Sequence, residues 1–197
     1  MSSRLIYLSQ LISKYNSNWL MRIFLMLALL LLWIFNFSTW PVSNPTLMKI
    51  SGQEGLLDLL LFYSPQEAFS AFTNYGEVGR DLYLNFIAAD FIFIFIYSIG
   101  LSFLITSLVQ KVCCDSSVWL ILNLVPLGIG LFDAVENLSI FAMLIIYPEV
   151  NTYVATVAGT STLCKHILSI FALMILGYGG LILLFRHCGI KLCRSHR

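Results

Sequence analysis

The sequence has few charged residues. Only 11% of its 197 residues are Asp, Glu, Lys or Arg, whereas 59% are hydrophobic and the mean hydropathy is +0.87. Soluble domains carry about 25% charged residues, so this composition excludes a soluble enzyme or a soluble binding domain. The formal net charge of +1 provides no attraction for nucleic acid, and we expect no nucleic-acid partner. The chain is therefore expected to lie in a bilayer.

Motifs for redox or metal chemistry are also lacking. The five cysteines include an adjacent pair and a pair five residues apart, but no C-x-x-C of the kind found in thiol redox sites. Of the three histidines, only His166 falls at membrane depth, and no second histidine faces it. We therefore expect neither haem, nor zinc, nor any other cofactor. No nucleophile or phosphate motif is present either, so the sequence leaves open whether the protein is an enzyme.

What the chain does contain is four long apolar segments. A helix of about 20 mostly apolar residues crosses the hydrocarbon core of a membrane. The predicted spans, all within one membrane domain covering 1–197, are 19–40, 82–109, 118–147 and 153–186. Together they predict an all-α fold, a four-helix transmembrane bundle. A cleaved signal peptide at the start is the weaker alternative, because no small-x-small cleavage site follows the first segment.

The distribution of basic residues predicts the orientation of this bundle. Lys and Arg gather on the cytoplasmic side of membrane spans. If the N-terminus is cytoplasmic, most basic residues fall on that side, including those of the basic tail 187–197, and only Lys49 and Arg80 lie in the outer loop. We therefore predict a multi-pass protein with both termini in the cytoplasm. The pattern fits a bacterial inner membrane and a eukaryotic membrane equally well.

The outer loop, 41–81, is expected to contain a short amphipathic helix. The run Ser64-Pro65-Gln66-Glu67 is typical of a helix start with a capping box. A helix over 65–75 should follow and stop at Gly76. We favour a helix that lies on the membrane surface and covers the bundle, and a mobile gate over a cavity is the alternative. The apolar run 56–63 is too short to span and is expected to dip against the interface.

Charged residues inside the predicted spans form the candidate site. A charged group at the centre of a bilayer costs about 2.5 to 3.5 kcal/mol, so such groups persist only when they are paired, protonated or used. A helix rise of about 1.5 Å per residue places the acids and the lysine at similar depth. The candidate intramembrane polar cluster consists of Asp90, Asp133, Glu136, Asn137 and Lys165, with Arg80 and His166 as basic groups that could reach it.

The charge balance of this cluster favours shared protons. Three carboxylates face one certain cation, Lys165, and both burial and repulsion between like charges favour a neutral carboxyl group. At least one of the three is therefore expected to hold a proton. The network could be architectural, with Lys165 pairing Glu136 to fix the helix register. A proton relay, a substrate clamp or an acid/base pair are the functional alternatives.

Helix-breaking residues precede the acids of the third span. Pro126 removes a backbone hydrogen bond, which predicts a kink near Asn123. The kink could widen a pocket beside Asp133. Proline and glycine are also common in membrane helices without such a role, and this second interpretation is favoured.

A set of short motifs resembles a known group of proteins. The motifs are Tyr63-Ser64-Pro65-Gln66-Glu67-Ala68, Gly79-Arg80, Tyr83, Asp90, Asp133-x-x-Glu136-Asn137, Tyr147-Pro148 and Thr162-x-x-Lys165. Over most of 56–185 they resemble small four-helix membrane proteins without an assigned activity. The resemblance implies the four-helix topology and marks the polar cluster, but it implies no mechanism.

Three classes of function remain open. The favoured one is a non-enzymatic bundle that binds a small amphipathic ligand or a membrane lipid below the outer helix, with Glu136, Asp133 and Lys165 as polar anchors. The second is a membrane enzyme on lipid-like substrates, with Asp133 or Glu136 as general acid/base and Lys165 stabilising negative charge. The third is an accessory subunit or homo-oligomer whose charges pair with a partner's helices. An enclosed cluster would favour the first two classes, and an outward-facing one the third.

Overall fold

The structure is a computed structural model that describes residues 3–113 and 116–188. Over these residues the chain is helical and has no strand, which confirms the predicted all-α bundle. Four helical segments are long and apolar enough to cross a membrane. They are α2 (Asn18–Phe37), α4 (Pro65–Val112), η2 (Leu120–Leu124) continued by α6 (Val125–Ile146), and α7 (Thr152–His187). This is the architecture of a multi-pass membrane protein.

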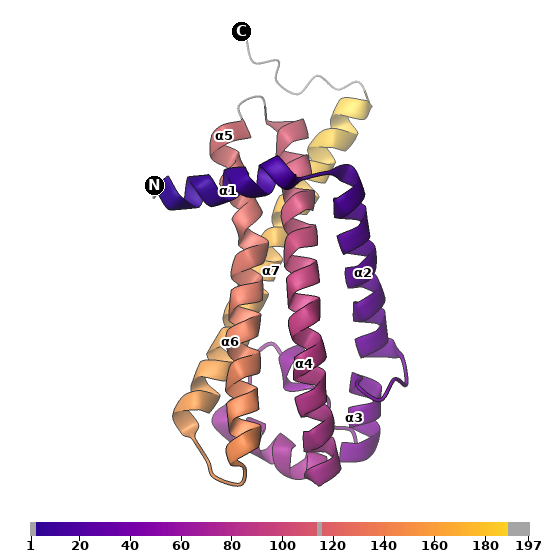
Figure 1. The fold of residues 1–197 in the computed structure, drawn as a ribbon, viewed down its shortest axis with the longest axis vertical. Helices are drawn as coiled ribbons and strands as arrows, with labels where there is room; N and C mark the ends of the chain where they lie inside the picture. The colour runs from indigo at the N-terminus through magenta and orange to yellow at the C-terminus, as the bar shows by residue number, and fades with distance from the viewer. Residues whose placement is uncertain (1–2, 114–115, 189–197) are drawn as a thin grey trace.

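Helix α4 is the central element of the bundle. It packs against α2, α6 and α7, and Figure 1 shows it between α2 and α6 along the long axis. Half of the most apolar stretch of α4, and of the segment formed by η2 and α6, is buried, compared with 6% for α2 and 11% for α7. The interior of the bundle is therefore built mainly by α4 and α6, and the apolar outer faces of α2 and α7 are available to lipid.

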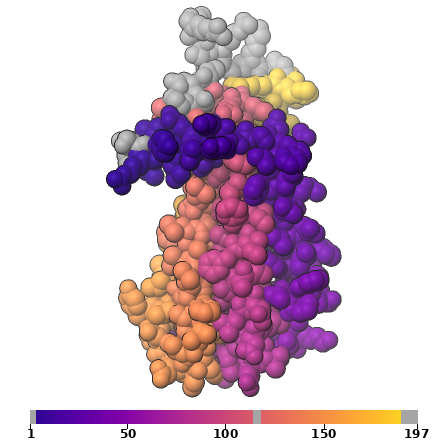
Figure 2. Space-filling model, in the orientation of Figure 1, coloured from indigo at the N-terminus to yellow at the C-terminus, as the bar shows by residue number. Residues whose placement is uncertain are grey.

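The two ends of the bundle differ. Helix α1 (Ser3–Tyr15), which the sequence analysis did not predict, lies across one end, here called the α1 end, where α7 also finishes (Figures 1 and 2). Asn123 holds α1 there, because its Nδ2 atom donates to the backbone oxygen of Ser9 at 3.1 Å and to Thr106 Oγ1 at 3.0 Å. The opposite, α3 end carries α3 (Asn44–Ser51).

Irregular structure opens the third span. Helix α5 (Ser116–Trp119) is followed by the 3₁₀ segment η2, and only then does α6 begin, with Pro126 in its first turn. Asn123, where we predicted a kink, lies within η2. The irregularity is therefore a 3₁₀ segment that precedes α6 and Pro126.

The predicted start and stop of the outer helix are both present. Ser64 accepts a bond from the backbone N–H of Glu67 at 3.3 Å, and Glu67 accepts one from the Ser64 N–H at 2.7 Å, which completes the capping box. Gly76 breaks the helix with φ 62° and ψ −173°, a conformation at positive φ that glycine adopts more readily than any other residue. The chain resumes a helix at once, so the short outer helix and the second span together make up α4.

Residues 56–64, here called the inserted loop, enter the bundle further than predicted. We expected the run 56–63 to dip against the interface. Leu56, Leu57 and Tyr63 are instead buried in the core with residues of α4, α6 and α7, whereas the side chains between Asp58 and Tyr63 are exposed. The short helix η1 (Leu57–Leu59) forms the centre of the inserted loop. Two of the loop's backbone polar groups have side-chain partners: the Leu57 N–H donates to Tyr83 Oη at 3.1 Å, and Nε2 of His166 lies 2.9 Å from the Leu60 oxygen. Non-helical backbone is tolerated inside a membrane protein under these conditions.

Gly159 makes room for the inserted loop, which gives a test of this packing. A Cβ atom at residue 159 would collide with the backbone oxygen of Tyr63, whereas a Cβ at Gly177, on the same helix, would meet nothing within 4 Å. Gly159→Ala should therefore lower the melting temperature in detergent. Gly177→Ala should preserve or raise it, because alanine favours a helix over glycine by about 1 kcal/mol. Equal melting temperatures for the two variants would contradict the placement of the loop.

Candidate polar site within the bundle

A single lysine of α7 lies between two carboxylates of α6. Lys165 Nζ is 2.8 Å from Asp133 Oδ1 and 2.7 Å from Glu136 Oε2. The two acids are three residues apart, so they project from one face of α6 toward α7. Glu136 is fully buried, and Asp133 and Lys165 are each only 7% exposed. These ion pairs therefore join α6 to α7 inside the bundle, and the contact of Lys165 with Glu136 is the one that the architectural alternative assumed.

The second oxygen of each carboxylate is bound by side chains of other elements. Tyr97 Oη, on α4, donates to Asp133 Oδ2 at 2.9 Å. Tyr63 Oη, on the inserted loop, donates to Glu136 Oε1 at 3.3 Å, and Thr162 Oγ1 lies 2.6 Å from the same oxygen. Groups from α4, α7 and the inserted loop thus converge on two acids of α6, and both tyrosines were outside the predicted site.

Asp90 and Asn137 form a separate pair in the same region. The Asn137 Nδ2 atom donates to Asp90 Oδ2 at 2.7 Å and links α4 to α6. Asn137 is fully buried, and its Oδ1 atom accepts no hydrogen bond from any described residue. A buried acceptor without a donor costs about 1 to 3 kcal/mol, so this amide oxygen is a position where a hydrogen-bond donor would be stabilised.

Asp58 is a member of the site that the sequence analysis missed. It lies on η1 of the inserted loop, close enough to Lys165, Glu136 and Asp133 for their charges to act on it. Burial raises the pKa of Asp58 to about 7, with further upward contributions from the two acids and a downward one from the lysine. Its Oδ1 atom is buried and has no hydrogen-bond partner among the described residues. An acid inside an otherwise apolar run was the signal that could have revealed it.

Arg80 and His166 lie outside these contacts. The Arg80 guanidinium is stacked over the ring of Tyr147, 4.2 Å from its centroid, and donates to the backbone oxygen of Phe72 at 3.0 Å. It therefore binds the end of the helical stretch that precedes Gly76. The His166 ring is bonded to the inserted loop. Within the described chain, Lys165 is the one basic side chain in an ion pair with an acid.

The polar cluster consequently holds more acid than base. Its members are Asp58, Asp90, Asp133, Glu136, Asn137 and Lys165. Of its four carboxyl groups only Asp133 and Glu136 contact the lysine, and an unpaired buried charge costs several kcal/mol. Protons or a bound cation must balance the excess. No group of three or more His, Cys, Asp or Glu side chains is arranged to hold a metal ion in the part of the chain that the structure describes.

Comparisons with known proteins leave this geometry to be interpreted by itself. No protein-family model, curated protein or solved structure matches the chain.

The pairing of Lys165 with two acids predicts a strong thermodynamic coupling. Lys165→Met strips the cation from Asp133 and Glu136 together and should destabilise the protein by about 3 to 5 kcal/mol. Adding Glu136→Gln should recover part of that loss, because it removes one of the stranded acids. Unfolding in detergent, followed for both single variants and the double variant, measures the coupling.

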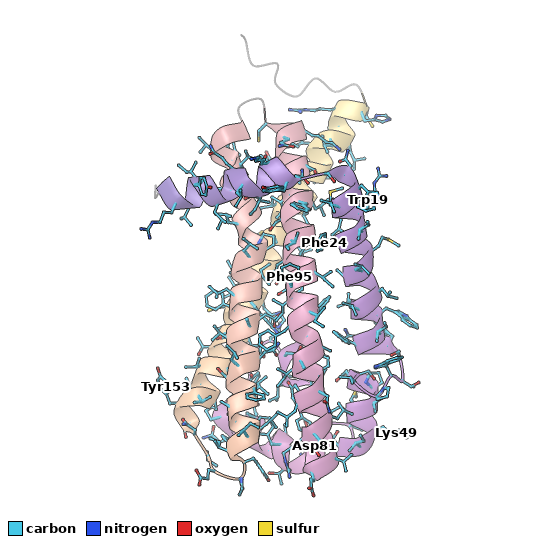
Figure 3. All side chains as sticks on the ribbon, in the orientation of Figure 1. Trp19, Phe24, Lys49, Asp81, Phe95 and Tyr153 are labelled. Atoms are coloured by element: carbon cyan, nitrogen blue, oxygen red, sulfur yellow. The ribbon has the colours of Figure 1, made fainter. Side chains whose placement is uncertain are left out.

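A control variant separates this coupling from a general effect of removing charge. Lys49→Met changes an exposed lysine at the α3 end, where Figure 3 labels it, and should leave stability nearly unchanged. Additive effects of Lys165→Met and Glu136→Gln would contradict the ion pair.

The raised pKa of Asp58 predicts how stability depends on pH. The folded protein binds the Asp58 proton more tightly than the unfolded chain, whose pKa is near 3.8. The stabilisation from this proton is complete below about pH 4 and is lost as the pH rises to about 7. Asp58→Asn, which stays neutral, should flatten the melting temperature across this range and raise it near pH 8 relative to the unchanged protein.

The matched control for the pH series is Glu149→Gln, an exposed acid between α6 and α7. It should leave the pH profile of the parent protein intact. Parallel profiles for the parent and Asp58→Asn would show that Asp58 does not titrate in this window.

Proposed function

We propose that the protein binds a small amphipathic ligand at the polar cluster, and that the head group of this ligand carries a positive charge, as in an amine. The observation that carries the proposal is that four carboxyl groups and only one lysine lie together in an enclosed site. A cationic head group would neutralise part of that excess. It would also offer hydrogen-bond donors to Asn137 Oδ1 and Asp58 Oδ1, which have none from the described residues.

Enclosure of the cluster supports ligand binding over the role of an accessory subunit. Asp90, Asp133, Glu136, Asn137 and Lys165 are each at most 7% exposed. Charges that pair with a partner's helices would have to face outward from the isolated bundle. These side chains face one another across α4, α6 and α7 instead.

The position of Lys165 supports binding over catalysis. A lysine that stabilises negative charge in a transition state must present its charge to the reacting atoms. Lys165 already lies within 2.8 Å of two carboxylate oxygens, so its charge is compensated. The site is therefore better suited to hold a cation than to stabilise a developing anion.

Asp58 and the inserted loop indicate from which side a ligand would reach the polar cluster. Asp58 is half-buried, whereas the other four acidic and amide members of the cluster are buried. The adjacent residues Leu59, Leu60, Leu61 and Phe62 expose their apolar side chains. An amphipathic ligand could lay its apolar chain along these residues while its head group reaches Asp58 and then the interior.

The predicted orientation places this approach on the outer side of the membrane. If both termini are cytoplasmic, as the distribution of Lys and Arg indicates, the α3 end and the inserted loop belong to the outer half of the bilayer. A ligand would then arrive from the outer leaflet or from the space beyond it.

A thermal-shift comparison tests the charge of the ligand. A long-chain alkylamine should raise the melting temperature of the protein in detergent, whereas the alcohol and the carboxylate of equal chain length should not. Asp58→Asn should reduce the shift given by the amine, and Glu149→Gln should leave it intact. Equal shifts for amine, alcohol and carboxylate, or an undiminished amine shift in Asp58→Asn, would contradict the proposal.

A further inference from the structure

A second polar feature lies at the α1 end of the bundle. At the α1 end, the turn between α1 and α2 and the last turns of α4 line an open cavity of about 390 Å³ at the surface of the protein. All the residues that line it are polar or charged: Asn16, Ser17, Asn18, Ser107, Gln110 and Lys111. A polar cavity of this size, in a chain that is 59% hydrophobic, is far from the polar cluster and has no part in the proposed function.

The cavity combines a cation with a buried acceptor. Lys111 forms no ion pair with an acid in the described residues, and Asn18 and Ser17 are exposed donors beside it. Asn16 Nδ2 donates to Ser107 Oγ at 3.0 Å, but Asn16 Oδ1 is buried and accepts no bond from the described chain. A ligand that matches this lining has an anionic phosphate and a hydrogen-bond donor close together.

The surroundings of the cavity place it at a membrane surface with positive potential. The chain has no acid before Glu54, so the charged residues of α1 and α2 are all basic, and the one acid that the sequence places near this end is Asp115, just after α4. Arg186 donates to the backbone oxygens of Lys111 and Val112, each at 2.9 Å, and so adds positive charge beside the cavity. Trp19 is 71% exposed at this end (Figure 3), as expected of a tryptophan among lipid head groups.

We infer that this cavity binds the head group of a phospholipid that carries a hydrogen-bond donor, such as phosphatidylethanolamine or phosphatidylglycerol. The phosphate lies against Lys111, with Asn18 and Ser17 as further donors. The ammonium of ethanolamine, or a hydroxyl of glycerol, donates to Asn16 Oδ1. Phosphatidylcholine, whose quaternary ammonium has no N–H, cannot make that last bond.

Lipid retention in nanodiscs of defined composition tests this inference. The full chain is reconstituted in mixtures of phosphatidylcholine with phosphatidylethanolamine or phosphatidylglycerol, and the lipid that remains bound is measured by native mass spectrometry. The donor-bearing lipids should be enriched over phosphatidylcholine. Lys111→Gln should weaken their retention about tenfold, the loss expected for one hydrogen bond to a charged group.

Two further variants distinguish binding of the lipid in the cavity from its general attraction to the basic surface at this end. Arg22→Gln removes one positive charge from the same end but not from the cavity lining, and it should retain the lipid. Asn18→Leu obstructs the cavity without changing charge and should lose it. Equal losses for Lys111→Gln and Arg22→Gln, equal retention of phosphatidylcholine, or full displacement by inorganic phosphate would overturn the inference.

Discussion

The structure depends on one buried lysine that contacts two acids of the neighbouring helix. Lys165 on α7 fixes the rotation and the height of that helix against α6, because its ammonium must meet both Asp133 and Glu136 within 2.8 Å. A shift of one residue along either helix would leave buried charges without partners, which is unfavourable. Apolar packing alone would not oppose such a shift. The lipid-facing surfaces of α2 and α7 provide no comparable constraint, since lipid tails are as apolar as the side chains that they cover.

Other elements are positioned by hydrogen bonds to the same two acids. Tyr97 brings α4 to Asp133, and Tyr63 brings the inserted loop to Glu136. The close approach of the loop to α7 requires Gly159, where any side chain would meet the Tyr63 backbone. The two acids therefore hold polar partners from α4, α7 and the inserted loop. Because α4 and the inserted loop also carry Asp90 and Asp58, the same arrangement gathers the carboxyl groups on which the proposed ligand binding rests.

The spans and their polar residues follow from local sequence rules. Long apolar runs predicted the spans within α2, α4, α6 and α7, the capping box predicted the start of α4, and the helix rise indicated that the acids and Lys165 lie at similar depth. Burial of the inserted loop could not be predicted in this way. A short apolar run fits the interface and the interior equally well, and only the contacts with distant residues such as Tyr83 and His166 decide between them. Asp58 was missed for that reason, and α1 and α3 carry no long apolar signal. The basic tail 187–197 lies mostly outside the described residues.

In the proposed ligand-free state, protons balance the acid excess of the polar cluster until a cation replaces them. Infrared spectroscopy of the ligand-free protein in nanodiscs at neutral pH measures this directly, through the C=O stretch of protonated carboxylic acids. Such a band is expected, weaker in Asp58→Asn and weaker again when an alkylamine is bound. A folded, ligand-free protein whose carboxyl groups are all ionised at neutral pH would contradict this proposal.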